Sequence, residues 1–185
     1  MDGWLILIYK IPVEPTRYRA SVWRKLKAAG AVYLQNGVAA LPGDAACERV
    51  MRGIVHEIAG MHGTAHLIKG MTLSDEAGLL AAFNAARDAE YGEVLGRCRD
   101  FHAELAKERA AAHLTFAELE ENEEDLAKLE AWLGKIRERD RFTASLRPEA
   151  DRALAACRDD LGNFAESVYR AADHGSAASP EPSEG

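Results

Sequence analysis

The sequence has no hydrophobic run long enough to cross a membrane. Its longest apolar run, Trp4–Tyr9, is far shorter than the roughly 20 residues that a membrane helix requires. No basic segment precedes that run, as one would in a signal peptide. We therefore expect a cytoplasmic protein that has no membrane partner.

The sequence is also poor in cysteine and in recognisable catalytic motifs. Its three cysteines, Cys47, Cys98 and Cys157, are odd in number, widely spaced and placed at apolar helical positions, which predicts buried free thiols. It contains no Walker loop, no dinucleotide-binding glycine fingerprint, no paired CxxC and no HExxH. We therefore predict no catalytic residues, no metal site and no cofactor, and a protein that is not an enzyme.

What the sequence does contain is a globular composition with an uneven distribution of charge. Hydrophobic residues make up 48% and charged residues 29% of the chain, which is close to the averages for globular proteins. The net charge is −7, yet residues 1–70 carry a net charge of +4 and residues 71–185 carry −11. An acidic protein can therefore present a basic face on its N-terminal part.

Four segments near the N-terminus have strand patterns. Trp4–Tyr9 is an apolar run typical of a central strand covered on both faces. Two further strands, 31–35 and 38–41, flank Asn36-Gly37, a pair that favours a type I′ hairpin turn. Residues 64–69 supply a fourth short strand.

Two helices alternate with these strands. Thr16 is placed to cap a first helix that ends at Gly30, and Asp44 is placed to cap a second. The order β-α-β-β-α-β predicts an α+β protein with a ferredoxin-like domain over residues 1–72, in which both helices cover one sheet face. The other face would then be a binding surface or a dimer interface, because large exposed apolar patches are uncommon on monomers.

From Ser74 onward the pattern is helical. Glycines at 78, 92 and 96 weaken the first long helix by about 1 kcal/mol each relative to alanine, which allows a break near one of them. Thr115–Glu118 fits a capping box that starts a second helix with a heptad-like leucine seam, and Pro148 starts a third. We predict a three-helix region over 73–174 and a disordered tail over 175–185.

Two groups of basic residues are candidate binding sites. The first helix interleaves cations with Tyr18 and Trp23, a composition suited to phosphate contacts and stacking, although solvation alone would also explain it. These candidate DNA-binding residues are Arg17, Arg19, Arg24, Lys25 and Lys27. Forked hydrogen bonds from Arg137, Arg139 and Arg141 could hold an oxyanion such as sulfate, phosphate or chromate, although helix-to-helix salt bridges would use the same residues.

Several segments spread along the chain carry a family resemblance: Trp4–Pro12, Val22–Lys27, Gly30–Gln35, Val38–Pro42, Glu118–Asn122 and Trp132–Arg137 with Arg139-Asp140. Together, over roughly residues 3–172, they resemble the N-terminal domain family of the bacterial chromate-resistance protein ChrB. The resemblance implies a dimeric cytoplasmic regulator of a chromate-efflux operon that binds operator DNA and responds to chromate. Full-length members carry a further C-terminal domain that this sequence ends before, so regulation without chromate sensing is an alternative.

The first 70 residues are also similar, more distantly, to the ferredoxin-like domains of the phenylacetate-operon repressor PaaX and of small CRISPR-associated nucleases. In those nucleases an acidic residue at the end of the first strand carries metal, whereas this sequence has Tyr9-Lys10 there. We therefore predict a transcriptional regulator whose basic first helix contacts DNA. A protein-interaction or oligomerisation module without DNA binding is the alternative, and a metal-dependent nuclease or chromate reductase is a more remote one.

Overall fold

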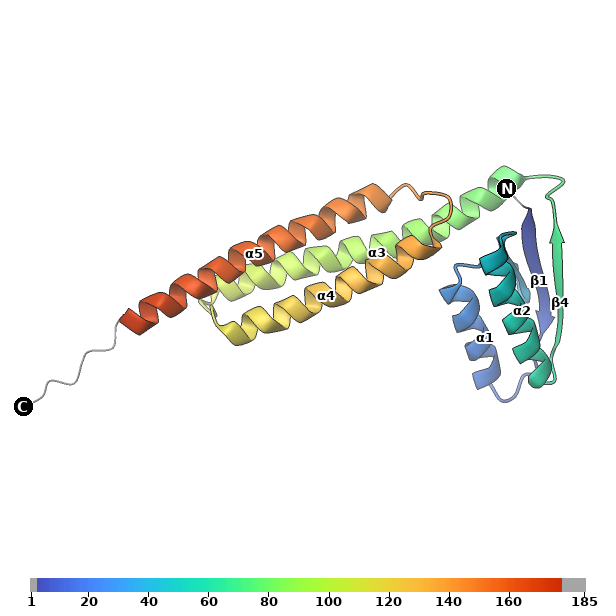
Figure 1. Ribbon diagram of the computed structural model, residues 1–185, viewed down its shortest axis with the longest axis horizontal. Helices are drawn as coiled ribbons and strands as arrows, with labels where there is room; N and C mark the ends of the chain where they lie inside the picture. Colours follow the sequence, from blue (N-terminus) through green and yellow to red (C-terminus); the bar gives the residue numbers. More distant parts are fainter. Residues whose placement is uncertain (1–2, 178–185) are drawn as a thin grey trace, which may run out of the picture. The chain divides into compact units, whose positions relative to one another are not determined.

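The computed structural model describes residues 3–177, which form five helices and one four-stranded sheet (Figure 1). The chain divides into two compact units, and each is described by itself. The first unit comprises the chain up to Arg87 together with Arg139–Ala144. The second comprises Asp88–Glu138 and the chain from Ser145 onward.

The first unit is built on an antiparallel sheet in the order β2-β3-β1-β4. Its strands are β1 (Trp4–Lys10), β2 (Val32–Gln35), β3 (Val38–Pro42) and β4 (Thr64–Gly70). Helices α1 (Arg17–Ala28) and α2 (Ala45–Gly60) lie side by side against the sheet (Figure 1). The predicted α+β class and the ferredoxin-like order of elements are confirmed.

The core of this unit is formed by alternate residues of the central strands and by one side of each helix. Leu5 and Leu7 of β1 pair with Leu41 and Ala39 of β3, and all four are buried. The helices contribute the buried side chains Val22, Leu26, Cys47, Met51, Ile54 and Ile58. This i, i+3, i+4 spacing is the amphipathic pattern expected of helices that cover one sheet face.

The turn between β2 and β3 differs from the predicted type I′ turn. A type I′ turn requires positive φ at both central residues, but in this turn only Gly37 has one, at +75°. The strand register shifts between Tyr33 and Gln35, and a bulge of this kind lets a single left-handed glycine reverse the chain. A Cβ at Gly37 would lie 2.6 Å from the Tyr9 carbonyl oxygen, so glycine is required there.

The two predicted helix caps in this unit have different outcomes. Asp44 caps α2 as predicted, because its Oδ1 accepts a hydrogen bond of 2.8 Å from the Cys47 amide. Thr16 precedes α1, but its backbone is already helical and its side chain makes no capping hydrogen bond. The predicted Thr16 cap is therefore wrong, because capping requires an extended backbone at that residue.

The first unit extends beyond residue 72, the predicted domain boundary, because two aromatic rings from later in the chain cover Trp4. The Phe83 ring stacks on the indole at 5.4 Å, and the Phe142 ring lies 5.8 Å from it. Trp4 is on the sheet face opposite the helices, and these rings bury it. Farther along that face, Ile8 and Ile68 are 41% and 50% exposed.

The second unit is made of three long helices that run beside one another (Figure 1). Helix α3 (Glu76–Ala110), which begins within the first unit, is continuous through Gly78, Gly92 and Gly96, so no break occurs at these glycines. Helix α4 (Phe116–Arg139) begins after Thr115, whose Oγ1 accepts a hydrogen bond from the Glu118 amide as in a capping box. Its leucine seam is buried as predicted: Leu119, Leu126, Leu129, Leu133 and Ile136.

Helix α5 (Arg147–Ala177) completes the second unit and runs three residues into the segment predicted as a tail. The rest of that segment, residues 178–185, lies outside the described residues. Between residues 3 and 177, no helix combines the length and the hydropathy that crossing a bilayer demands.

Candidate functional site

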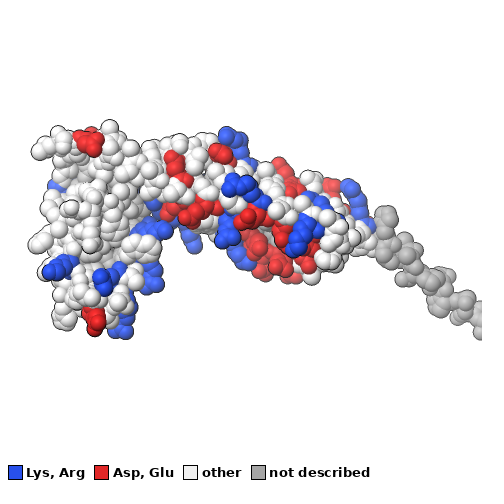
Figure 2. Space-filling view, turned by 180° about the vertical axis from the view of Figure 1, so that it is seen from behind, with Lys and Arg blue, Asp and Glu red and all other residues white. Residues whose placement is uncertain are grey.

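Helix α1 carries the five cations that the sequence predicts as DNA contacts. All five are exposed in the structure: Arg17, Arg19, Arg24, Lys25 and Lys27. Because successive residues of an α-helix are about 100° apart, these cations do not share one face. They form three stripes around the helix, one facing away from the core and one on each flank. Figure 2 shows Lys and Arg side chains gathered on the lower part of the N-terminal unit.

Lys25 occupies the flank of α1 that faces α2. Its Nζ pairs with Oε2 of Glu57 on α2, and the Ser21 hydroxyl donates to Oε1 of the same carboxylate at 2.8 Å. The hydrogen bond from Lys25 is the main reason that the pKa of Glu57 lies below its usual value. Lys25 therefore bridges the two helices, and its charge is paired with a carboxylate within the unit.

Arg17 and Arg24 lie on the outer side of α1, seven residues apart and hence on the same face. The guanidinium carbon of Arg17 lies 5.6 Å from the centre of the Tyr18 ring. Such a cation–π contact orients the side chain and leaves its charge unbalanced. These two arginines are the cations best placed to contact a phosphate backbone.

Arg19 and Lys27 lie on the second flank of α1, on either side of Trp23 at spacings of four residues. Lys27 Nζ is 5.3 Å from the centre of the Trp23 ring, and Arg19 Nη2 donates to the Val13 carbonyl oxygen at 3.0 Å. Arg19 and Trp23 form one wall of a hollow of about 680 Å³, which we call the aromatic hollow. It is lined by Tyr9, Lys10, Ile11, Arg19, Trp23, Tyr33, Gln35, Asn36 and Gly37.

Two tyrosines hold the strand side of the aromatic hollow in place. The hydroxyls of Tyr9 and Tyr33 are 2.9 Å apart, and the Tyr9 amide donates to the Gly37 carbonyl oxygen at 2.8 Å. Burial, and then the hydrogen bond with Tyr9, raises the pKa of Tyr33. The Tyr33 phenol therefore stays neutral at physiological pH and can donate or accept hydrogen bonds.

The predicted oxyanion-binding arginines have other partners. Arg137 in the second unit donates from Nε to Oδ1 of Asp151 at 3.0 Å, and its Nη2 pairs with the same oxygen. Arg141 in the first unit lies 3.5 Å from Oδ2 of Asp44. Arg139 is also in the first unit and packs closely against Gly30. A Cβ added to Gly30 would lie 2.8 Å from the Cβ of Arg139. Oxyanion binding by these three residues stays a prediction, and an oxyanion would compete with a carboxylate at two of them.

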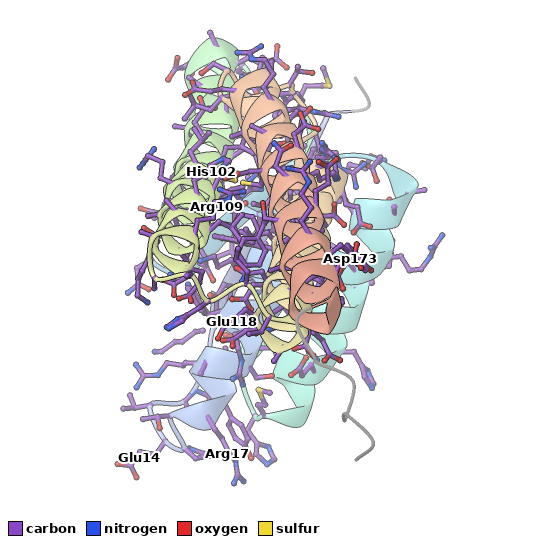
Figure 3. All side chains as sticks on the ribbon, turned by 90° about the vertical axis from the view of Figure 1, so that its left-hand side faces the viewer. Glu14, Arg17, His102, Arg109, Glu118 and Asp173 are labelled. Atoms are coloured by element: carbon purple, nitrogen blue, oxygen red, sulfur yellow. The ribbon has the colours of Figure 1, made fainter. Side chains whose placement is uncertain are left out.

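A second polar cluster lies between α3 and α5 within the second unit (Figure 3). His102 Nδ1 is 2.6 Å from Oδ2 of Asp160, and Arg109 Nη2 donates to Oδ1 of Asp160 at 2.7 Å. His102 Nε2 is 3.5 Å from the Cys157 sulfur. Burial raises the pKa of the Cys157 thiol to about 12, so the thiol is inert at neutral pH.

The cysteine prediction is confirmed, since Cys47, Cys98 and Cys157 are all free and buried. Sequence reasoning missed the His102–Asp160–Arg109 network, because its members are about 50 to 60 residues apart and meet only when α3 packs on α5. It also missed the aromatic hollow. The available signal was strand alternation. Tyr9 lies two residues after the buried Leu7 on β1, and Tyr33 pairs with the buried Ala39, so both tyrosines are on the sheet face that the helices cover.

The ferredoxin-like sheet, its exposed basic helix and the three-helix unit together define an α+β protein of two units. The family model described as "Protein ChrB, N-terminal" matches residues 19–175. The chain therefore belongs to the ChrB N-terminal family, and this membership associates it with chromate resistance. A comparison with curated proteins found no match.

Proposed function

We propose that this chain is a non-enzymatic cytoplasmic regulator of transcription in the response to chromate, and that α1 contacts operator DNA. Arg17 and Arg24 carry the proposal, because they are exposed on the outer side of α1 and, within residues 3–177, neither forms an ion pair with a carboxylate. Membership of the ChrB family supports the link to chromate. Arg19 and Lys27, on the flank of the same helix, extend the basic surface along a phosphate backbone.

The charge of the rest of the chain limits this contact to a small area. The net charge is −7, so DNA is repelled by much of the protein and attracted locally by α1. We therefore expect few phosphate contacts and a modest dependence of affinity on salt. Each contact contributes about 0.9 to the slope of log K against log salt concentration.

The test is fluorescence anisotropy with duplex DNA from the promoter of the protein's own gene, titrated over a salt series. The double variant Arg17→Ala/Arg24→Ala should bind more weakly and reduce the salt slope by about 1.8, the value for two lost phosphate contacts. Arg52→Ala/Arg170→Ala is the matched control, since it removes the same charge from α2 and α5, where each arginine has an i, i+4 glutamate partner. Unchanged binding in the α1 double variant would refute DNA contact through this helix.

We extend the proposal to a homodimer formed through the sheet face opposite the helices. Ile6 and Ile68 are register partners on β1 and β4, and Ile8 follows on the same face. We call these three residues the isoleucine strip. A two-fold interface brings the same patch of both subunits together, and an uncharged apolar strip is complementary to itself. If the protein dimerises but shifts no DNA at low salt, the oligomerisation module is the better description of its function.

A further inference from the structure

The aromatic hollow has the size and composition of a small-ligand site. Its volume of about 680 Å³ lies within the roughly 300 to 1,000 Å³ typical of such sites. All of its lining residues belong to the first unit, in α1, β1, β2 and the segments beside them. The hollow is therefore a feature of one compact unit.

The charge of the hollow selects an anionic ligand. Its lining includes the cation Arg19 and no carboxylate; Lys10 also borders it, but alternation along β1 places that side chain on the opposite sheet face. The hydrogen bond from Arg19 to the Val13 carbonyl uses one guanidinium nitrogen, and a guanidinium has five N–H donors. Lys27, whose Nζ lies 5.3 Å from the centre of the Trp23 ring, adds a second positive charge beside this wall of the hollow.

The aromatic residues of the hollow select a flat ligand. Trp23 is 49% exposed although it lies on a helix packed against the sheet, and Tyr9 and Tyr33 face it from the strands. The hydrogen bond between the two phenols restrains both side chains, and such restraint reduces the entropy lost on binding. Stacking of a base on an aromatic side chain contributes about 1 to 3 kcal/mol.

From this arrangement we infer that the aromatic hollow binds a mononucleotide, with the base stacked on Trp23 and Tyr33 and the phosphate held by Arg19. The amides of Gln35 and Asn36 lie at the same site and can pair with the edge of the base. The inference is independent of duplex DNA contact through α1, because Arg17 and Arg24 do not line the hollow. A mononucleotide bound there would act as an effector next to the proposed DNA-binding helix.

The test is isothermal titration calorimetry of the full chain with AMP, GMP, CMP and UMP. At least one of the four should bind. Ribose 5-phosphate lacks the base and the matching nucleoside lacks the phosphate, so each should bind at least about tenfold more weakly. Trp23→Ala and Arg19→Ala should each raise the Kd by about tenfold or more. Arg24→Ala, which removes the same charge from the outer side of the same helix, should leave the Kd unchanged.

Two substitutions at Tyr33 distinguish the loss of ring stacking from a general loss of structure. Tyr33→Phe keeps the ring and should keep binding within a few-fold, whereas Tyr33→Ala should lose it, with circular dichroism melts confirming that both variants fold. Absence of binding by all four nucleotides would overturn the inference, as would binding that Tyr33→Ala and Arg19→Ala leave intact. If a single-stranded octanucleotide displaces the mononucleotide and binds far more tightly through the same residues, the hollow is a strand-binding site and the effector role is wrong.

Discussion

At the scale of single residues, Asp160 of α5 is a carboxylate that two side chains of α3 contact. It accepts from Arg109 and lies within hydrogen-bond distance of His102. Partial burial alone would raise the pKa of Asp160, but the hydrogen bonds from His102 and Arg109 outweigh burial and hold the pKa below its ordinary value of 3.8. The carboxylate form is therefore favoured in the folded protein.

We predict that Asp160→Asn lowers the free energy of unfolding at pH 7 by about 1 to 3 kcal/mol, the usual value of hydrogen bonds to a charged group. A depressed folded-state pKa contributes stability that is complete above the unfolded pKa and is lost as the pH falls through the folded pKa. The difference between wild type and variant should therefore shrink below about pH 4. Urea unfolding at pH 7, 5 and 3 measures it.

Asp125→Asn is the matched control for this prediction. Asp125 is exposed and pairs with Lys128 within α4, and an exposed pair of this kind contributes little to stability because water screens it. An equal loss of stability in both variants, at every pH, would show that the Asp160 network has no special role.

At the scale of elements, the structure separates glycines that the fold requires from glycines that it tolerates. Gly37 has a φ of +75° and faces the Tyr9 carbonyl, whereas a Cβ at Gly92 in the middle of α3 would meet no atom within 4 Å. The first position needs the conformation that only glycine adopts readily. The second position has no such need.

We predict opposite effects of alanine at these two positions. Gly37→Ala should destabilise the protein by about 1 to 2 kcal/mol or more, because alanine is strained in the left-handed region. Gly92→Ala should stabilise it by about 0.5 to 1 kcal/mol through its higher helix propensity. Thermal melts followed by circular dichroism measure both, and a lower melting temperature for Gly92→Ala would contradict the account.

Some features of these elements could be predicted from the sequence and others could not. The strands and helices could be predicted from apolar patterns, because the continuous run around Leu5 and Leu7 marks a central strand and the seam around Leu126 and Leu129 marks the buried side of a helix. The turn type and the Thr16 cap were wrong because both depend on backbone angles at one residue. Strand alternation could place Tyr9 and Tyr33 on the helix-covered face, but the aromatic hollow also depends on strand register and helix position, which no local pattern contains.

At the scale of the whole molecule, the proposed dimer rests on the isoleucine strip. A carboxylate placed in a buried apolar interface costs several kcal/mol unless it is paired. Ile8→Asp/Ile68→Asp should therefore abolish dimerisation while both side chains remain compatible with the folded monomer, since each is already about half exposed.

Size-exclusion chromatography with light scattering tests this prediction. The wild-type chain should have twice the monomer mass of 20.2 kDa, and the double variant should have the monomer mass. Leu73→Asp is the control, because Leu73 is fully exposed outside the strands and should not change the mass. A monomeric wild type would remove the dimer from the proposed function.

The rings that cover Trp4 have a consequence for any attempt to divide the protein. Phe83 and Phe142 come from opposite ends of an excursion, from Asp88 to Glu138, that leaves the first unit and returns to it. A fragment cut at residue 72 would retain all four strands but lose both rings, and the indole of Trp4, whose Nε1 has no hydrogen-bond partner among the described residues, would face water. The smallest autonomous piece of this sheet is therefore discontinuous in sequence, and a short linker joining Arg87 to Arg139 would isolate it better than any truncation.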